Sequence, residues 1–117
     1  MNSRSSQVSL QSPLLKSVLE TILKIASPEK VILFGSQAKG TATEHSDYDF
    51  LIIENEPFGE TGSRRKEAGK LGWALSEFGI TADVLIYSPE EIEQRRHWQN
   101  GVVVEALKEG KVLYERA

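Results

Sequence analysis

The sequence predicts an α/β (α+β) domain in which a small mixed β-sheet is flanked by helices. Short apolar segments rich in β-branched residues, typical of buried strands, recur along the 117-residue chain. Segments with helical spacing of apolar residues alternate with them, and glycine or proline marks most of the boundaries. No internal repeat or linker interrupts this pattern. We therefore expect a single domain over residues 12–117, preceded by a polar, flexible leader over residues 1–11.

The first predicted helix begins at Ser12-Pro13 and ends before Pro28. Serine can cap a helix N-terminus, and proline is tolerated at the first helical position. The residue before a proline avoids the helical conformation, which explains the end of this helix. Residues 30–34 (KVILF) then predict a buried strand that stops at Gly35.

The next segment, 35–46, is small and polar, with at most a single helical turn after Ser36. Residues 48–53 favour a second strand. A turn-rich loop over 54–62 leads into a helix from about residue 63 to residue 78. The inner stripe of that helix is expected to be Ala68, Leu71, Leu75 and Phe78, with Gly79 suited to its C-terminal cap.

Residues 80–87 (ITADVLIY) predict a third strand. A helix then begins at Ser88, which is the expected cap, with Glu91 at the reciprocal capping-box position. We expect this helix to run to about Trp98. The remaining predicted elements are a helix over 102–109, closed by Gly110, and an edge strand over 111–115.

Composition limits the functions that are open to this chain. Its formal net charge of −3 disfavours extended nucleic-acid binding, which usually needs a basic surface. It has no cysteine and only two histidines, so a catalytic metal would be a hard cation held by carboxylates, Mg²⁺ or Mn²⁺. No apolar run is long enough to span a membrane and no secretory signal precedes the domain, so we expect a soluble, cytoplasmic protein.

Two aspartates open the second predicted strand. Asp47 and Asp49 are two residues apart, so their side chains should project from the same face. Their Cα atoms are expected about 6.5–7 Å apart at strand rise, close enough for both carboxylates to hold one metal ion or bridge two. Because bare carboxylates at this spacing repel each other, a divalent cation is the usual counter-charge. The pair therefore predicts a site for one or two divalent cations, and two such ions can stabilise the attacking and leaving oxygens of a phosphoryl displacement.

Two further features belong to the same predicted site. Asp83 interrupts an otherwise apolar strand, where an unpaired charge is unfavourable. Gly35-Ser36 lets a backbone approach a ligand closely and offers N–H groups at a first helical turn to a triphosphate. Lys39 is a weaker candidate for the same phosphates.

The segment GSQAKGTATEHSDYDFLI (residues 35–52) resembles the Gly-Ser…Asp-x-Asp signature of the polymerase-beta-like nucleotidyltransferase superfamily. It is most similar to the minimal nucleotidyltransferase domains of prokaryotes, and the resemblance covers most of the chain, including ADVLIY and the final EALKEGKVLYE. It implies that Asp47 and Asp49 are ligands of two Mg²⁺ ions, and that Asp83 is the third ligand and activates the attacking hydroxyl. Gly35 and Ser36 would hold the phosphates of a nucleoside triphosphate.

The resemblance also implies a reaction and a partner. Enzymes of this superfamily transfer a nucleoside monophosphate to a hydroxyl group and release pyrophosphate. Minimal domains often pair with a small helical protein of the HEPN class and act as the antitoxin of a toxin–antitoxin pair, in some cases by adenylylating the partner. For this chain we expect ATP as donor and a HEPN-type acceptor, in a homo- or hetero-oligomer that the sequence does not define.

Each feature has a plainer interpretation. The aspartate pair can be a simple turn, Asp83 a solvent-facing edge charge, and Gly35-Ser36 an ordinary strand-ending turn. Ser46 either binds nucleotide or only braces the loop before Asp47. The basic clusters at 64–66 and 95–97 suggest nucleic acid, but we favour solvated helix faces with one buried indole. His45 is expected to be an exposed loop residue.

Two other functions remain as alternatives. A non-catalytic antitoxin would neutralise its partner by binding alone, although such a module has no need of three like charges in one cleft. A sugar-nucleotide transferase also uses Asp-x-Asp, but the chain is too short for the nucleotide-binding domain that those enzymes usually need.

Overall fold

The computed structural model describes residues 12–43, 45–55 and 63–116. The predicted leader at 1–11 and most of the predicted loop at 54–62 lie outside the described residues. The elements are α2 (Pro13–Ile25), β1 (Lys30–Phe34), α3 (Ser36–Lys39), β2 (Tyr48–Ile53), α4 (Arg64–Ser76), β3 (Ala82–Tyr87), α5 (Pro89–Arg95), α6 (Val102–Glu109) and β4 (Lys111–Glu115). No helix within the described ranges has the length and apolar character needed to cross a membrane.

Local capping confirms the predicted helix starts. The hydroxyl of Ser12 accepts a hydrogen bond from the N–H of Leu15 at 3.2 Å. Both halves of the predicted capping box are present, because Ser88 and Glu91 each accept from the other's backbone N–H. These side chains occupy backbone donors that the helix itself leaves unpaired.

Three predicted boundaries were wrong. α4 ends at Ser76 with Glu77 as its C-cap, rather than near residue 78 with Gly79 as the cap. β3 begins at Ala82 rather than at residue 80, because its neighbour β2 begins at Tyr48 directly opposite. α5 ends at Arg95 rather than near Trp98. Ile92 is the one buried residue of α5. No buried side chain beyond it stabilises a further helical turn.

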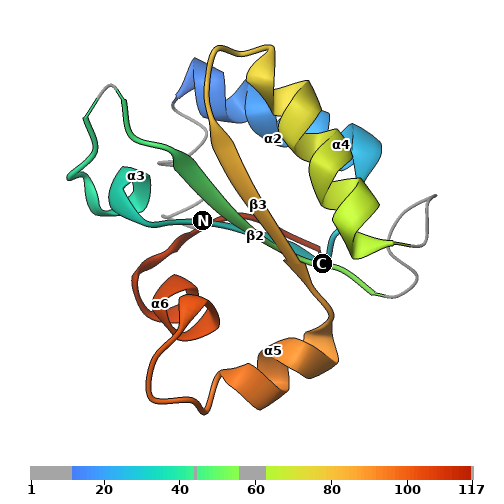
Figure 1. Cartoon of the computed structure of the whole chain (residues 1–117), viewed down its shortest axis with the longest axis vertical. Helices are drawn as coiled ribbons and strands as arrows, with labels where there is room; N and C mark the ends of the chain where they lie inside the picture. Colours follow the sequence, from blue (N-terminus) through green and yellow to red (C-terminus); the bar gives the residue numbers. More distant parts are fainter. Residues whose placement is uncertain (1–11, 44, 56–62, 117) are drawn as a thin grey trace.

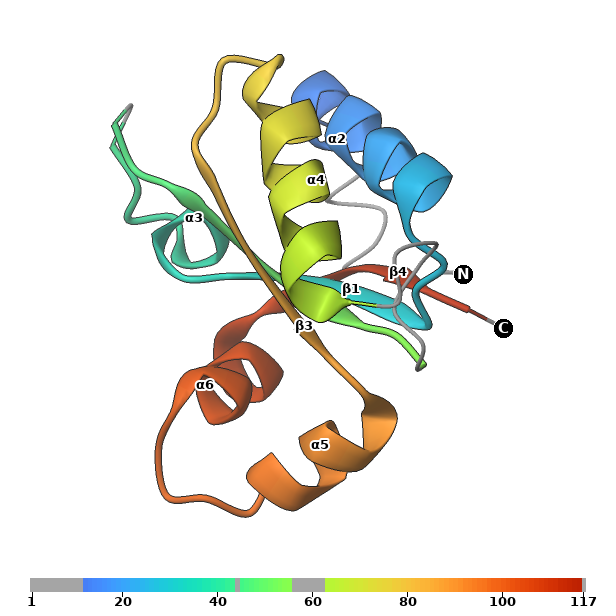
Figure 2. The ribbon, with the colours of Figure 1, turned by 45° about the vertical axis from the view of Figure 1, so that its right-hand side comes forward.

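Within the described residues the sheet has the strand order β3-β2-β1-β4. β1 pairs antiparallel with β2 and with β4, whereas β2 and β3 are parallel and are joined through α4. The predicted mixed sheet and the edge position of β4 are confirmed, and β3 forms the opposite edge. α2 and α4 cover one face of the sheet, and α5 and α6 lie against the other (Figures 1 and 2).

Alternating residues of each strand supply the two cores. On the side of α2 and α4, Phe50 and Ile52 of β2 pack with Leu71 and Leu75 of α4, all of them fully buried. On the other side, Leu51 and Ile53 pack with residues of α5 and α6, among them Ile92, Val103 and Ala106. Because strand side chains alternate between faces, the side chain of every odd-numbered residue of β2 projects toward α5 and α6.

A pair of carboxyl groups is buried where β2 meets α4. Glu54 is 2% exposed and Glu67 is 3% exposed. The N–H of Ser27 donates to Oε2 of Glu54 at 2.7 Å, while Oε1 of Glu54 and Oε2 of Glu67 have no other described partner. Burial, reinforced by a hydrogen bond and the charge of Glu54, raises the pKa of Glu67 to about 8. The predicted apolar stripe of α4 did not include this residue.

Candidate active site

The two strands that carry the aspartates are parallel neighbours, and their register places Asp49 directly beside Asp83. Paired residues of adjacent strands project from the same face of a sheet. Asp49 and Asp83 share the parity of Leu51 and Leu85, so both carboxylates lie on the face of α5 and α6. Asp47, two residues before Asp49, leads into β2 from the same end.

Electrostatics show that these carboxylates act on one another. Asp49 is half-buried, whereas Asp47 and Asp83 are exposed. Burial raises the pKa of Asp49, and Asp83 raises it further through its charge and a hydrogen bond. Asp47 contributes in the same direction, as does Glu105, which reaches the group from α6. The arrangement is therefore a concentration of negative charge at the starts of β2 and β3.

Gly35 is fitted to this cluster. It follows β1 and adopts φ 76° and ψ −159°, a conformation that is essentially restricted to glycine. A Cβ built at this position would overlap Oδ2 of Asp49. The sequence predicts that this glycine lets the backbone approach a ligand, and the structure adds that the carboxylate of Asp49 lies against the same position.

α3 begins immediately after Gly35. Its first turn is closed onto the carbonyl of Gly35, which accepts from the N–H groups of Ala38 and Lys39 at 3.1 Å. The hydroxyl of Ser36 is half-buried and has no hydrogen-bond partner among the described residues. The side-chain amide of Gln37 donates to the carbonyl of Ser46 at 3.3 Å, which ties this turn to the loop that carries Asp47.

Ser46 makes contacts within its own loop. Its hydroxyl accepts from the N–H of Thr43 at 2.9 Å, and its N–H donates to the carbonyl of Thr43 at 3.1 Å. These bonds brace the approach to Asp47, which is one of the two roles considered from the sequence. A cavity of about 440 Å³ adjoins the loop on the side of Tyr48 and Thr81. Ser46 and the exposed His45 contribute to its lining.

Lys39 points to α6 rather than into the acidic cluster. Its Nζ lies 3.1 Å from Glu109 and 3.8 Å from Glu105. A hydrogen bond with Glu109 and the charges of both glutamates raise the pKa of Lys39. Glu105 thus contacts Lys39 and also acts on Asp49, a role that sequence reasoning missed. Nothing in the spacing of the α6 segment indicates it, because it depends on how α6 packs across the sheet.

The donor groups suit a hard divalent cation. Carboxylate oxygens are what Mg²⁺ and Mn²⁺ prefer. Burial, and after it the neighbouring carboxylates, raise the pKa of Asp49, and a bound cation would favour its charged form. In the described part of the chain, no three His, Cys, Asp or Glu side chains stand close enough together to form a metal cage. The sequence predicts Asp47, Asp49 and Asp83 as the ligands of such an ion, and of these the register of β2 and β3 places Asp49 beside Asp83.

Sequence comparison identifies the family of the chain. Residues 15–113 match the family model described as "Nucleotidyltransferase domain". Two proteins of Methanocaldococcus jannaschii, each named "Putative protein adenylyltransferase", resemble it. The first is 35% identical over 86 residues, covering 74% of this chain and 78% of the relative. The second is 29% identical over 87 residues, covering 74% of this chain and 58% of the relative.

Solved structures share the fold. In a crystal structure of a toxin–antitoxin with AMP-PNP, one chain matches with a TM-score of 0.55 and 21% identity, covering 86% of this chain and 73% of that chain. A "putative nucleotidyltransferase" from Sulfolobus solfataricus matches with a TM-score of 0.54 and 20% identity, covering 98% of this chain and 91% of that chain. At these identities the likeness shows the mixed-sheet architecture.

Proposed function

The chain belongs to the nucleotidyltransferase domain family, and from that premise we propose that it transfers AMP from ATP to a hydroxyl group of a protein. The observation that carries the proposal is the pairing of Asp49 with Asp83 on one face of the sheet, beside Asp47 and against Gly35. The relative that is 35% identical and named as a protein adenylyltransferase supports a protein as the acceptor.

In this proposal the three aspartates divide the chemistry. Asp47 and Asp49 would hold Mg²⁺, with two ions expected and Mn²⁺ as a substitute, and Asp83 would be the third ligand. A bound metal would neutralise phosphate charge and orient the reacting groups. The acceptor oxygen bonds to the α-phosphorus as the bond to the bridging oxygen of the β-phosphate breaks, and pyrophosphate leaves. Asp83, which is exposed on the edge strand, accepts the proton of the attacking hydroxyl.

The phosphates are assigned to the turn after β1. The N–H groups of Ser36 and Gln37, which open α3, and the unengaged hydroxyl of Ser36 are the donors next to the acidic cluster. Ser46 and Lys39 are the additional candidates. For Lys39 the assignment requires that its Nζ exchange Glu109 for a phosphate oxygen.

We assign the acceptor to a small helical protein of the HEPN type encoded beside this chain, in a toxin–antitoxin pair. The support is indirect: a structural neighbour comes from a toxin–antitoxin complex that contains AMP-PNP. The alternative remains a module that neutralises the partner by binding alone. The acidic cluster favours catalysis, because binding alone gives no reason to place Asp49 and Asp83 side by side on one face of the sheet.

The test is transfer of label from ATP carrying ³²P at the α-phosphate, with Mg²⁺ and the helical partner. The wild-type chain is expected to label the partner. Asp47→Ala and Asp49→Ala should reduce labelling on the order of 100-fold or more, since metal-held charge stabilisation is worth several kcal/mol. If the double variant neutralises the partner as well as wild type and neither transfers label, the binding-only function is correct.

A further inference from the structure

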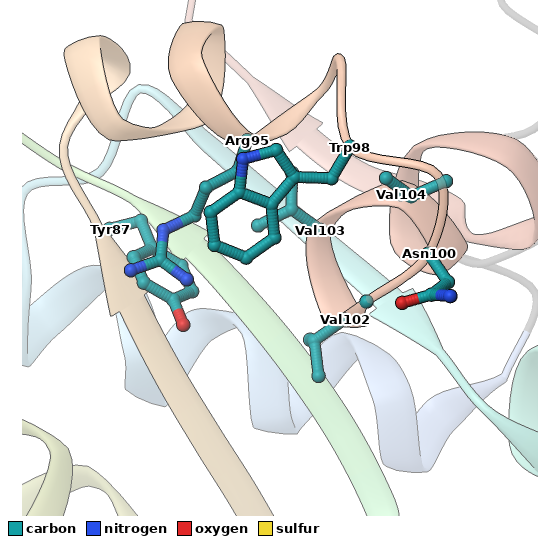
Figure 3. Close-up of a pocket in the computed structure, with 8 residues that line it drawn as sticks. Tyr87, Arg95, Trp98, Asn100, Val102, Val103 and Val104 are labelled. Carbon is teal, nitrogen blue, oxygen red and sulfur yellow. The ribbon is translucent and has the colours of Figure 1, made fainter.

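The connection between α5 and α6 exposes apolar side chains. Trp98, for which the sequence suggested a buried indole, is 54% exposed, and Val102 is 39% exposed. Both line a cavity that also involves Tyr87 and Arg95 (Figure 3). We refer to these four residues, Tyr87, Arg95, Trp98 and Val102, as the Trp98 surface. Exposed aromatic and aliphatic groups gathered in one place are typical of an interaction site.

Arg95 is held in a fixed position on this surface. Its guanidinium carbon lies 4.8 Å from the ring centroid of Tyr87 and 4.8 Å from that of Trp98 (Figure 3). Contacts of this kind attract a cation to the ring faces and limit the rotamers of a long side chain. The group is therefore preorganised, which lowers the entropy lost when it binds a partner.

The charge of Arg95 has no ionic partner in the described part of the chain. Neighbouring basic side chains contact glutamates: Arg64 lies 2.9 Å from Glu91, and Arg96 and His97 each lie 3.4 Å from Glu93. Among the residues that the structure describes, no carboxylate pairs with Arg95. A fixed cation surrounded by apolar groups is complementary to an acidic side chain that is itself flanked by apolar residues.

The size of the cavity favours a protein over a small molecule. Its volume is about 80 Å³, whereas ligand pockets are typically about 300–1,000 Å³. A cavity of this size accommodates one side chain rather than a nucleotide. Trp, Tyr and Arg are also the residue types that dominate the energetics of protein–protein interfaces.

The Trp98 surface lies on the same side of the sheet as the aspartates. Tyr87 has the parity of Asp83 and is four residues further along β3, or roughly 13 Å at strand rise. On α6, Val102 is one helical turn before Glu105, which acts on Asp49. A protein seated on the Trp98 surface therefore extends over the acidic cluster.

We propose that the Trp98 surface is the docking surface for the acceptor protein, and that the acceptor presents a carboxylate beside an apolar side chain to Arg95 and Trp98. The inference rests on the proposed adenylyl transfer and identifies the part of the chain that recognises the substrate. It separates recognition of the acceptor from the aspartates that perform the reaction.

The first test is steady-state transfer to the helical partner. Trp98→Ala and Arg95→Gln should each raise KM for the partner at least tenfold while kcat stays within twofold, because docking is lost and the aspartates are intact. Trp73→Ala is the matched control: its indole is 79% exposed on α4, on the other side of the sheet, and both constants should stay at wild-type values. Unchanged KM in both docking variants overturns the proposal.

The second test measures docking without chemistry. The chain has two tryptophans, so Trp73→Phe leaves Trp98 as the sole indole. In an Asp47→Ala background, titration with the helical partner should change the emission of Trp98 saturably. If light scattering shows that the partner binds but the emission of Trp98 does not change, the Trp98 surface is not the docking surface. The proposal is also contradicted if an RNA oligonucleotide changes the emission and the helical partner does not. Failure of wild type to transfer label contradicts the proposed function instead.

A charge-exchange test distinguishes loss of docking from loss of folding. Arg95→Glu should abolish docking, and replacing the complementary acidic residue of the partner by arginine should restore it. Restored binding requires a folded variant, so the result does not depend on stability. If no acidic-to-arginine change in the partner restores binding while the melting temperature of Arg95→Glu equals that of wild type, the assignment of an acidic contact to Arg95 is wrong.

Discussion

Gly35 joins the end of β1 to α3 in a conformation that only glycine adopts readily, and its Cα lies against the carboxylate of Asp49. Any residue with a Cβ would meet two obstacles at this position. The positive φ would strain its backbone, and the Cβ would displace Oδ2 of Asp49. The residue thus sets the position of a proposed metal ligand without contacting substrate through a side chain.

We predict that Gly35→Ala lowers the free energy of unfolding by about 1–3 kcal/mol from backbone strain. It should lower adenylyl transfer further, on the order of 100-fold, because Asp49 is misplaced. Denaturant unfolding and the labelling assay measure the two effects. Gly69→Ala is the matched control: the position lies inside α4 with open space around it, so a gain of roughly 0.5–1 kcal/mol with unchanged transfer is expected. Equal behaviour of the two variants would contradict the role of Gly35.

The Glu54–Glu67 pair predicts a pH-dependent stability. The pKa of Glu67 is raised to about 8 from a usual value of 4.5, so the folded state retains a proton that the unfolded state has released. The stabilisation is complete below pH 4.5 and is lost as the pH rises toward 8. The loss should be on the order of a few kcal/mol across this window, measured by denaturant unfolding at several pH values.

Glu67→Gln isolates this effect. Glutamine retains a donor toward Glu54 but does not titrate, so the variant should lose most of the slope between pH 5 and pH 8 and be more stable than wild type at pH 9. Glu77→Gln, an exposed glutamate after α4, should leave the slope unchanged. A wild-type slope in Glu67→Gln would show that the proton is not held by this pair.

Sequence reasoning had unequal success with individual residues. The spacing of Asp47 and Asp49 predicts that they share a face, and an acidic residue inside an apolar strand draws attention to Asp83. Glu105 and Glu67 carry no such signal, because each is one glutamate on a helix rich in charge. Their roles arise from contacts across the sheet, which depend on where the helices pack.

Secondary-structure elements were predictable where short-range chemistry determines them. Ser12 and Ser88 cap the helices that they were expected to cap, and the β-branched segments form strands. Prediction failed at the end of α5, where the outcome depends on burial rather than on capping. The resulting connection holds Trp98 outside a helix and exposes it.

Removal of the cap at α5 should be measurable. Ser88 is buried and accepts from the N–H of Glu91 at 3.2 Å. Ser88→Ala is predicted to lower the free energy of unfolding by about 1 kcal/mol, because that donor loses its partner. Ser76→Ala, an exposed position at the end of α4, should cause no comparable loss. Similar midpoints for Ser88→Ala and wild type in urea would mean that the cap contributes little here.

The whole molecule was predictable as a mixed sheet flanked by helices, but its strand order was not. The order β3-β2-β1-β4 requires β2 and β3 to be adjacent and parallel, and their pairing connects segments more than 30 residues apart. No local pattern determines such a pairing. The convergence of Asp83 with Asp49 was consequently an expectation from family resemblance until the register became known.

Ligand binding should stabilise the whole domain in a metal-dependent way. At ATP concentrations about 100-fold above Kd with Mg²⁺, binding contributes roughly 2.7 kcal/mol, which corresponds to a rise in Tm of roughly 10 °C for a domain of this size. In EDTA the rise should largely vanish, because the three aspartates repel the triphosphate. An equal rise in Tm with and without metal would contradict the assignment of Asp47, Asp49 and Asp83 as ligands.

The parallel pairing of β2 with β3 has a consequence for how the chain folds. If β3 docked one residue out of step, Asp83 would turn to the opposite face, among Leu71 and Leu75. An unpaired charge is untenable in that apolar layer. The carboxylate of Asp83 therefore also destabilises the shifted register. In Asp83→Leu this penalty is absent, so the preference for the observed register over the shifted one should be smaller.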